Sequence, residues 1–282
     1  MSNDIVILGG ARTAIGTFGG SLAATPPTTL GSTVARAAME RAGVDPAQIG
    51  HVVFGTVINT EPRDMYLSRV AARDAGVPDE VPAMNVNRLC GSGMDAVGTA
   101  FRAIKAGEME LALAGGVESM SRAPYVMGKA DSAFSRGQKI EDTTIGWRFV
   151  NPKMKAQYGV ESMPETGDNV ATDYDISRED QDAFAKRSQD RWEAADKAGV
   201  FADEITPVSI PQRKGDPIVF DRDEHPRPGT TIEALTKLRP INGPDLTVTA
   251  GNASGVNDGA AAMLMASEAA ASQHGLTPIA RV

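Results

Sequence analysis

The chain has 282 residues, 41% of them hydrophobic and 23% charged, which is the composition of a folded globular protein of about two domains. Lys and Arg number 28 against 36 Asp and Glu, so the net charge of −8 opposes binding to nucleic acid. The first residues, MSNDIVILGG, lack the regions of a secretion signal, and no segment approaches the ~20 apolar residues of a membrane span, so we expect no membrane partner.

The first part of the chain alternates between strand and helix patterns. Short apolar segments rich in β-branched residues are followed by longer segments with helical spacing. The expected strands are 4–10, 51–58, 83–89 and 109–119, and the expected helices are 28–43, 64–76 and 91–107. This alternation predicts an α/β domain over residues 1–120, with a mostly parallel mixed sheet that helices cover.

Residues 121–244 have a different character, because Gly, Pro and charged residues are spread throughout them. One strong helix is expected at 177–199, where Ser177 caps the start and Glu179 suits the first turn. The segment is predicted to be an inserted, loop-rich domain.

The apolar pattern returns after this insertion. The stretch LTVTAGNASGVNDGAAAMLMAS contains an expected strand, so residues 245–277 are predicted to rejoin the first domain. A short helix and the apolar ending PIARV follow. Residues 278–282 are predicted to begin a further domain, which would make this chain the N-terminal portion of a longer protein.

The only cysteine, Cys90, lies between an expected strand and an expected helix in AMNVNRLCGSGMDAVGTAFRAI. A lone cysteine is most often a small buried hydrophobic side chain. Here GSG follows it, so small residues leave the sulfur approachable, and the positive end of the helix favours thiolate over thiol. The pattern therefore predicts a nucleophile. Because a single cysteine excludes an internal disulfide, we also expect a cytoplasmic protein.

No histidine stands out as a base for Cys90. His51 opens an apolar strand, and His274 precedes a helix-ending glycine, where a capping role is favoured. His225 lies in the charged loop DRDEHPRPGTT. None of these histidines carries a motif of general-base catalysis, so the nucleophile has no visible partner.

Several stretches resemble segments of the thiolase family, whose members are acetyl-CoA acyltransferases. They are ARTAIGTFGGSL, NRLCGSGM, GGVESMSRAPY, RKGD, TKLRP and TAGNASGVNDGAAA, in the family's order. The likeness extends along nearly the whole chain. It implies a thiolase-like N-terminal α/β domain with an inserted CoA-binding loop domain, and it implies that the C-terminal thiolase domain is absent.

The resemblance implies covalent acyl transfer in two steps. In thiolases the cysteine matching Cys90 attacks the carbonyl of a thioester or 3-ketoacyl-CoA and holds the acyl group until a second CoA species enters. Family members also use a GHP histidine, a CxGxG cysteine and an NEAF asparagine, none of which is present. His225 precedes a proline but lacks the glycine, so it is not assigned as the base. We therefore expect a catalytically incomplete, inactive portion of a thiolase.

The resemblance also assigns residues that bind CoA. Arg227 in DEHPRP matches an arginine over the adenine, Ser254 in GNASG matches a serine beside the pantetheine arm, and Met163 in ESMPET matches a methionine beside the acyl group. Without the resemblance these positions suggest a solvated charge, a turn and a core residue. The resemblance implies no metal and no cofactor, because acyl-CoA and CoA are the substrates. It also implies a homodimer or homotetramer.

Two other functions stay open. A ketoacyl synthase also places a cysteine at a helix start, and a non-catalytic CoA-binding or assembly module needs no base. The acyl chain is open as well. SMPET differs from the HMGTT of biosynthetic acetoacetyl-CoA members, and EDTTIGWRFVNPKMKAQYGVESMPET resembles the β-ketoadipyl-CoA thiolases, whereas NTEPRDMYLSRVAA resembles broad 3-ketothiolases.

Overall fold

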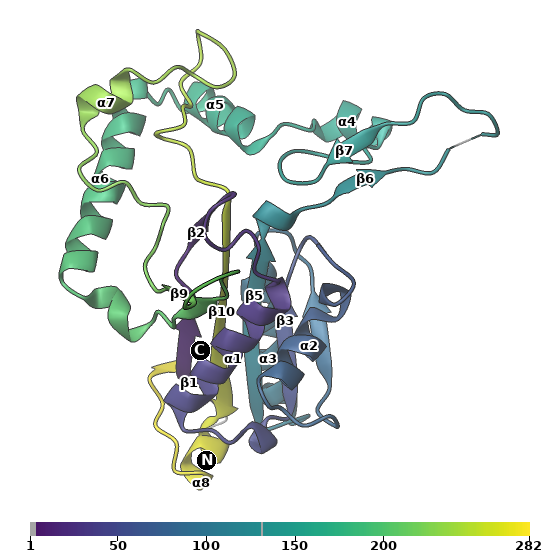
Figure 1. Cartoon of the computed structure of the whole chain (residues 1–282), viewed down its shortest axis with the longest axis vertical. Helices are drawn as coiled ribbons and strands as arrows, with labels where there is room; N and C mark the ends of the chain where they lie inside the picture. Colours follow the sequence, from purple (N-terminus) through teal and green to yellow (C-terminus); the bar gives the residue numbers. More distant parts are fainter. Residues whose placement is uncertain (1–3, 131) are drawn as a thin grey trace. The chain divides into compact units, whose positions relative to one another are not determined.

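The apolar segments from the first and last parts of the chain form one mixed sheet in the computed structural model, which describes residues 4–130 and 132–282 (Figure 1). Its strands are β1 (Ile5–Arg12), β2 (Gly16–Thr17), β3 (His51–Gly55), β4 (Ala83–Val86), β5 (Leu111–Ser119), β10 (Asn257–Ser267) and β11 (Ala280–Arg281). The order is β11-β1-β10-β5-β3-β4, and β2 pairs with β10.

The sheet is mixed because its last two strands run against the others. β3 pairs in parallel with β4 and β5. β10 is antiparallel to β1, β2 and β5, and β11 is antiparallel to β1. The strands β1 to β5 therefore all run one way, and the expected α/β class with a mostly parallel mixed sheet is confirmed.

Helices cover both faces of this sheet. The helices of this part are α1 (Pro27–Ala42), α2 (Leu67–Asp74), α3 (Ser92–Ala106) and α8 (Glu268–Gln273). Side chains alternate along a strand, so Leu111 and Leu113 of β5 join α1 and α2 in one core cluster, whereas Ala112 and Ala114 face α3 on the other side. Figure 1 shows α1 and α2 side by side over the strands.

The buried face of α3 is built from small residues. Ala96, Ala100 and Ile104 recur at intervals of four residues and are all nearly inaccessible to solvent. Alanines at this spacing let the helix axis approach the sheet closely. The helix therefore has a fixed position over the strands that lead to Cys90.

The described residues divide into two compact units. The first contains the sheet and comprises the residues up to Arg122 together with Ala202–Glu224 and Asn257–Val282. It also holds the hairpin of β8 (Val208–Ile210) and β9 (Ile218–Phe220). The second comprises Ala123–Phe201 and His225–Val256. Its elements are β6 (Tyr125–Met127), β7 (Ile140–Asp142), α4 (Pro152–Tyr158), α5 (Met163–Asp173), α6 (Arg178–Lys197) and α7 (Ile232–Thr236). Short 3-10 helices lie at Pro46–Gln48, Asp64–Tyr66 and Met120–Arg122 in the first unit, and another, Val200–Asp203, lies where the chain passes from the second unit back to the first.

The two units differ from the expected ranges 1–120, 121–244 and 245–277. Residues 202–224 join the first unit, because Phe220 lies in its core and Asp223 accepts a hydrogen bond of 2.7 Å from Arg12. Residues 245–256 join the second unit, since side chains of α5 and α6 hold this segment by hydrogen bonds.

The expected strand in LTVTAGNASGVNDGAAAMLMAS begins only at Asn257, and the residues before it form turns. Within the expected range 278–282, Ala280 and Arg281 form an edge strand beside β1. The expected helix at 177–199 is present as α6, and Ser177 caps it by accepting a hydrogen bond from the Asp180 N–H.

Across residues 4–130 and 132–282, no helix combines the length and the apolar character that crossing a membrane requires.

Candidate functional site

Cys90 lies at the end of the sheet where the parallel strands finish. β3 ends at Gly55, β4 ends at Val86 and β5 ends at Ser119, and the chain turns directly from β4 into α3. In open α/β sheets, ligands bind outside the carboxyl ends of the strands. The expected strand-to-helix turn is present at this ligand-binding end of the sheet, and Cys90 is a free, exposed cysteine on it.

The turn that carries Cys90 is tightly hydrogen-bonded. Leu89 has a φ of 50°, in the left-handed region that a leucine seldom adopts. Its N–H donates to Oδ1 of Asn87 at 3.0 Å. The hydroxyl of Ser92 accepts from the Arg88 N–H at 2.8 Å and donates to the Leu89 carbonyl at 2.6 Å. These bonds define the position of Cys90 between Leu89 and the first turn of α3.

Gly55 lets the start of α3 rest directly on the sheet, and Gly116 lies beside it. A Cβ added to Gly55 would lie 2.5 Å from the carbonyl carbon of Ser92 and 2.7 Å from the nitrogen of Gly93. A Cβ added to Gly116 would lie 3.6 Å from the Cα of Gly93. The first turn of α3, which directly follows Cys90 in the chain, is therefore held against the end of β3.

Acidic and basic side chains surround the turn without burying it. Asp95, in the first turn of α3, lies 3.5 Å from the Nε of Arg88 and 3.8 Å from a guanidinium nitrogen of Arg102. Both arginines are largely exposed, so each pair contributes little to stability.

Neither histidine of the first unit lies at the Cys90 end of the sheet. His51 is the first residue of β3, and Gly55, which contacts the start of α3, is the last, so roughly 13 Å of strand separates them. Burial lowers the pKa of His51, partly opposed by the charge of Glu108, and its Nε2 is buried without a hydrogen bond. His274 caps the end of α8, as expected. Neither side chain can activate Cys90 from there.

The residues assigned to CoA belong to the second unit. Arg227 and Ser254 are exposed, and Met163 is the first residue of α5, with 65% of its surface exposed. A Cβ added to Gly255 would lie 2.0 Å from the ring of His225. The glycine therefore lets the imidazole of His225 pack on the backbone beside Ser254, which brings the Arg227 and Ser254 loops together.

The surroundings of His225 fit a packing role. Burial lowers the pKa of His225, and the charge of Arg227 lowers it further. The Arg227 guanidinium donates to the carbonyl oxygens of His225 and Pro226 at 2.7 and 3.1 Å. The imidazole is accordingly neutral near pH 7.

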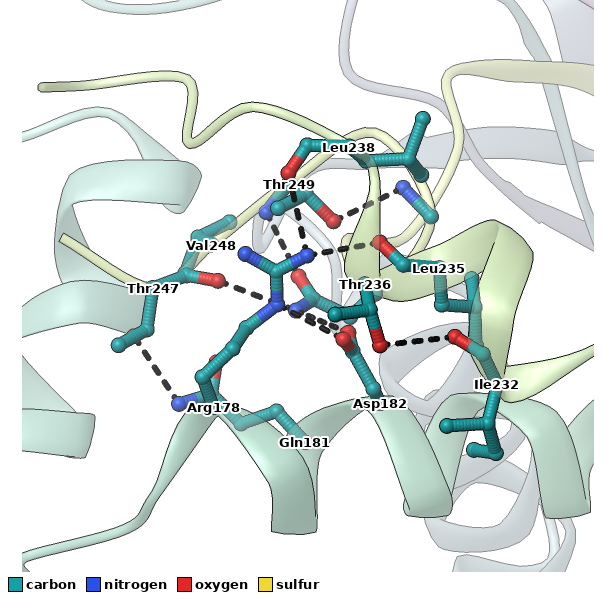
Figure 2. A network of polar contacts seen from close by, with 12 residues as sticks. Arg178, Gln181, Asp182, Ile232, Leu235, Thr236, Leu238, Thr247, Val248 and Thr249 are labelled. Atoms are coloured by element: carbon teal, nitrogen blue, oxygen red, sulfur yellow. Dashed lines mark hydrogen bonds and ion pairs between the residues drawn. The ribbon is translucent and has the colours of Figure 1, made fainter. Parts of the chain in front are cut away.

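A polar network on α6 fixes the segment that leads to Ser254 (Figure 2). Asp182, 2% exposed, accepts from Arg178 at 2.8 Å and from the side chain of Asn252 at 3.0 Å. Arg178 also donates to the carbonyls of Leu235 and Leu238 at 2.8 and 3.2 Å. One carboxylate thus ties α6 to the segment before Ser254, and its arginine partner ties α6 to the end of α7.

A second buried carboxylate holds the same segment from α5. Asp168 accepts from the backbone N–H groups of Thr247 and Val248, both at 2.9 Å, and from the amide of Asn242 at 2.7 Å. Burial alone would raise the pKa of Asp168, but these hydrogen bonds outweigh it and lower the pKa.

The second unit has few buried apolar side chains among its described residues, namely Ala171, Leu235 and Val248. Its stability therefore depends on the buried carboxylates.

Asp168→Asn is expected to destabilise the second unit by about 1–3 kcal/mol at pH 7, because an amide accepts fewer of these hydrogen bonds. Since the folded pKa is below the unfolded value of about 3.9, the carboxylate stabilises fully above that value and loses its contribution as the pH falls through the folded pKa. The difference between wild type and Asp168→Asn should therefore shrink on acidification. The exposed Asp173→Asn, on the same helix, is the matched control and should change neither quantity.

Tryptophan fluorescence during urea unfolding measures this prediction selectively. The chain has 2 tryptophans, Trp147 and Trp192, and both belong to the second unit. A stability difference between wild type and Asp168→Asn that stays constant from pH 7 to below pH 3 would contradict the role given to the carboxylate.

The glycines under α3 and the hydroxyl of Ser92 were not singled out by the sequence pattern. A glycine inside a strand signals a close approach of another backbone, and β5 contains the doublet Gly115 and Gly116. That signal was available in the sequence. The left-handed Leu89 had no such signal. Among residues 4–130 and 132–282, no group of His, Cys, Asp and Glu side chains is arranged to hold a metal ion.

Comparisons with known proteins agree along the whole chain. Residues 5–269 match the family described as "Thiolase, N-terminal domain". The β-ketoadipyl-CoA thiolase of Pseudomonas aeruginosa is 61% identical over 283 aligned residues, which cover 100% of this chain and 70% of that protein. The 3-oxoadipyl-CoA/3-oxo-5,6-dehydrosuberyl-CoA thiolase of Escherichia coli is 50% identical and covers 99% of this chain and 70% of its own length.

The fold agrees with solved thiolase structures as well. Human mitochondrial 3-ketoacyl-CoA thiolase in complex with CoA superposes with a TM-score of 0.89 at 38% identity, over 99% of this chain and 68% of that one. The acetyl-CoA acetyltransferase of Bacillus anthracis superposes with a TM-score of 0.89 at 37% identity, over 99% of this chain and 70% of that one. The chain therefore belongs to the thiolase family, as its motifs indicated.

Proposed function

We propose that this chain provides the nucleophile and the CoA-binding residues for thiolase-type acyl transfer, with Cys90 as the acyl carrier. The observation that supports this most directly is the position of Cys90. Cys90 is exposed at the carboxyl ends of parallel strands and just before a helix whose first turn packs on Gly55. This is the environment in which a thiol acts as a nucleophile.

In the proposed thiolytic step, the Cys90 sulfur bonds to the keto carbon of a 3-ketoacyl-CoA. The neighbouring carbon–carbon bond breaks, and its electron pair goes to the carbon that leaves as the methyl group of acetyl-CoA after taking a proton. The sulfur of free CoA then bonds to the acyl carbon, and the Cys90 sulfur leaves as thiolate. Since the sequence contains 1 cysteine, a second thiol within these residues cannot supply the proton.

The proposal assigns the second unit to CoA. The guanidinium of Arg227 stacks on the adenine, the loop at Ser254 lies along the pantetheine arm, and Met163 borders the acyl group. The contact between His225 and Gly255, which keeps the first two loops together, supports this assignment.

For the acyl chain we propose β-ketoadipyl-CoA. The relatives that are 61, 60 and 54% identical over nearly the whole chain are named β-ketoadipyl-CoA thiolases. Their named substrate carries a carboxylate at the far end of the acyl chain, which a short acetoacetyl group lacks.

We also propose that these residues alone do not sustain turnover. Neither His51 nor His274 can act as a base for Cys90, and the packed imidazole of His225 is not assigned that role. The exposed apolar side chains of Met65, Leu89 and Met94 support the proposed homodimer or homotetramer. The cytoplasmic location stays a prediction.

Protection of Cys90 from iodoacetamide tests substrate binding without requiring turnover. We expect β-ketoadipyl-CoA to slow alkylation of Cys90 at lower concentration than acetoacetyl-CoA does, because its acyl chain fits the proposed site. Intact mass reports the label on the single cysteine. Equal protection by both thioesters contradicts the proposed acyl chain. Protection by free CoA as strong as by either thioester indicates a CoA-binding module instead.

A further inference from the structure

We propose that Ser92 is a positioning residue for Cys90, whose hydroxyl closes the turn that presents the sulfur at the start of α3. The inference deepens the proposed function, since it rests on Cys90 as the nucleophile. It adds a side chain that acts through the turn and has no role in binding the substrate.

The Ser92 hydroxyl bridges the two sides of the nucleophile. It follows Cys90 in the chain, yet it accepts from the Arg88 N–H at 2.8 Å and donates to the Leu89 carbonyl at 2.6 Å, both of which precede Cys90. Ser92 is 5% exposed, so solvent cannot easily replace these bonds. Without the hydroxyl, the Arg88 N–H loses its acceptor, and the Leu89 carbonyl keeps only the 3.0 Å hydrogen bond from the Ser92 backbone N–H.

Packing does not explain the left-handed conformation of Leu89. The side chain is 64% exposed, so contacts with the rest of the unit cannot force a φ of 50° on this residue. The polar contacts that remain are those of its carbonyl with the hydroxyl and the backbone N–H of Ser92, and that of its N–H with the side chain of Asn87. Of the two side-chain partners, Ser92 is the buried one and Asn87 is exposed, so the hydroxyl of Ser92 is the firmer support.

The backbone of Ser92 is itself closely packed. It lies against Gly55, where even one added carbon atom would come within 2.5 Å of it. The hydroxyl is thus a fixed point from which the turn is held. Removing it should loosen Arg88, Leu89 and Cys90 while leaving α3 on the sheet. A change in thiol reactivity is then separable from a change in fold.

The test is the rate at which iodoacetamide alkylates Cys90 in the whole chain, followed by intact mass. We expect Ser92→Ala to react about tenfold more slowly, because a mobile sulfur spends less time beside the N–H groups of the helix. The matched control is Ser68→Ala. Ser68 is 1% exposed, and its hydroxyl accepts from the Phe54 N–H at 3.1 Å and lies within hydrogen-bond distance of two acceptors, the Met84 carbonyl at 2.8 Å and Oδ1 of Asn85 at 2.7 Å. That variant loses the same kind of bonds and should keep the wild-type rate.

Thermal unfolding separates positioning from stability. Both alanine variants should lower Tm by similar amounts, whereas Ser92→Ala alone should slow alkylation. Ser92→Thr keeps the hydroxyl and should restore the rate. If Ser92→Ala does not fold, Asn87→Ala, at an exposed position, removes the other side-chain bond of the turn and should also slow alkylation.

Wild-type or faster alkylation of Ser92→Ala, or equal slowing in Ser68→Ala, overturns the proposal. So does a wild-type rate in Asn87→Ala where Ser92→Ala is unfolded. Iodoacetamide needs no CoA site, so this readout is independent of acyl transfer. If the wild-type chain shows no acyl transfer but Ser92→Ala still slows alkylation, the proposed function fails and the positioning role of Ser92 stands.

Discussion

Acetyl-CoA is expected to transfer one acetyl group to this chain, slowly and without turnover because no base activates the thiol, and Cys90→Ala is expected to carry none. The Cys90 sulfur bonds to the acetyl carbon, the bond between that carbon and the CoA sulfur breaks, and CoA leaves with the proton of the thiol. Alanine has no group that could hold the acetyl. Because the chain has 1 cysteine, intact mass followed by peptide mapping locates the adduct without ambiguity.

Two controls show whether the folded site promotes this transfer. The urea-unfolded chain has the same thiol without the start of α3 and should be acetylated more slowly. His51→Ala should be acetylated as fast as wild type, because His51 lies at the other end of β3 and its Nε2 has no hydrogen bond to lose. An acetyl group that persists in Cys90→Ala would refute the assignment of the nucleophile. A slowed reaction in His51→Ala would show that the histidine acts on Cys90 after all.

Gly55→Ala is expected to destabilise the first unit by about 3 kcal/mol or more. The new Cβ would lie 2.5 Å from the carbonyl carbon of Ser92 and 2.7 Å from the nitrogen of Gly93. Both are backbone atoms, so no side-chain rotation relieves the contact, and α3 must move away from β3. The displacement would also move Cys90, so slower alkylation should accompany the loss of stability.

The control for Gly55→Ala is a glycine of α3 itself. A Cβ added to Gly98 meets only the flexible end of Arg102 at 3.3 Å, and alanine favours the helix by up to about 1 kcal/mol. Gly98→Ala should therefore keep or raise Tm in calorimetry. If Gly55→Ala is as stable as wild type, the start of α3 is free to shift, and the close packing of α3 on Gly55 is not needed for stability.

Most of the sheet and its covering helices could be predicted from the sequence. The strands are apolar segments, and apolar residues recur with helical spacing in the segments between them. The sequence also indicated the place of Cys90, since β4 and α3 flank it closely. The units were harder to predict. Two acidic residues, Asp168 and Asp182, hold the segment before Ser254 in the second unit, and a charge on a helix ordinarily indicates a solvated face.

The finer geometry of the site depends on contacts between residues far apart in sequence. Gly55 is informative only once its neighbour Ser92 is known, and Gly255 only once His225 is placed against it. Leu89 and Ser92 are only three residues apart in sequence. The left-handed φ of Leu89 nevertheless depends on how the turn joins the helix. No propensity of leucine predicts it.

The place of β10 in the sheet has a consequence for how the protein is made. This strand lies between β1 and β5, so that Ile5 pairs with Ser267 and Ser119 pairs with Asp258. During synthesis, β1 and β5 emerge early and must wait for nearly the whole chain before their common neighbour arrives. Contacts of such large sequence separation close slowly. Until then the sheet has two unpaired edges in its middle, and the nascent chain depends on protection from aggregation.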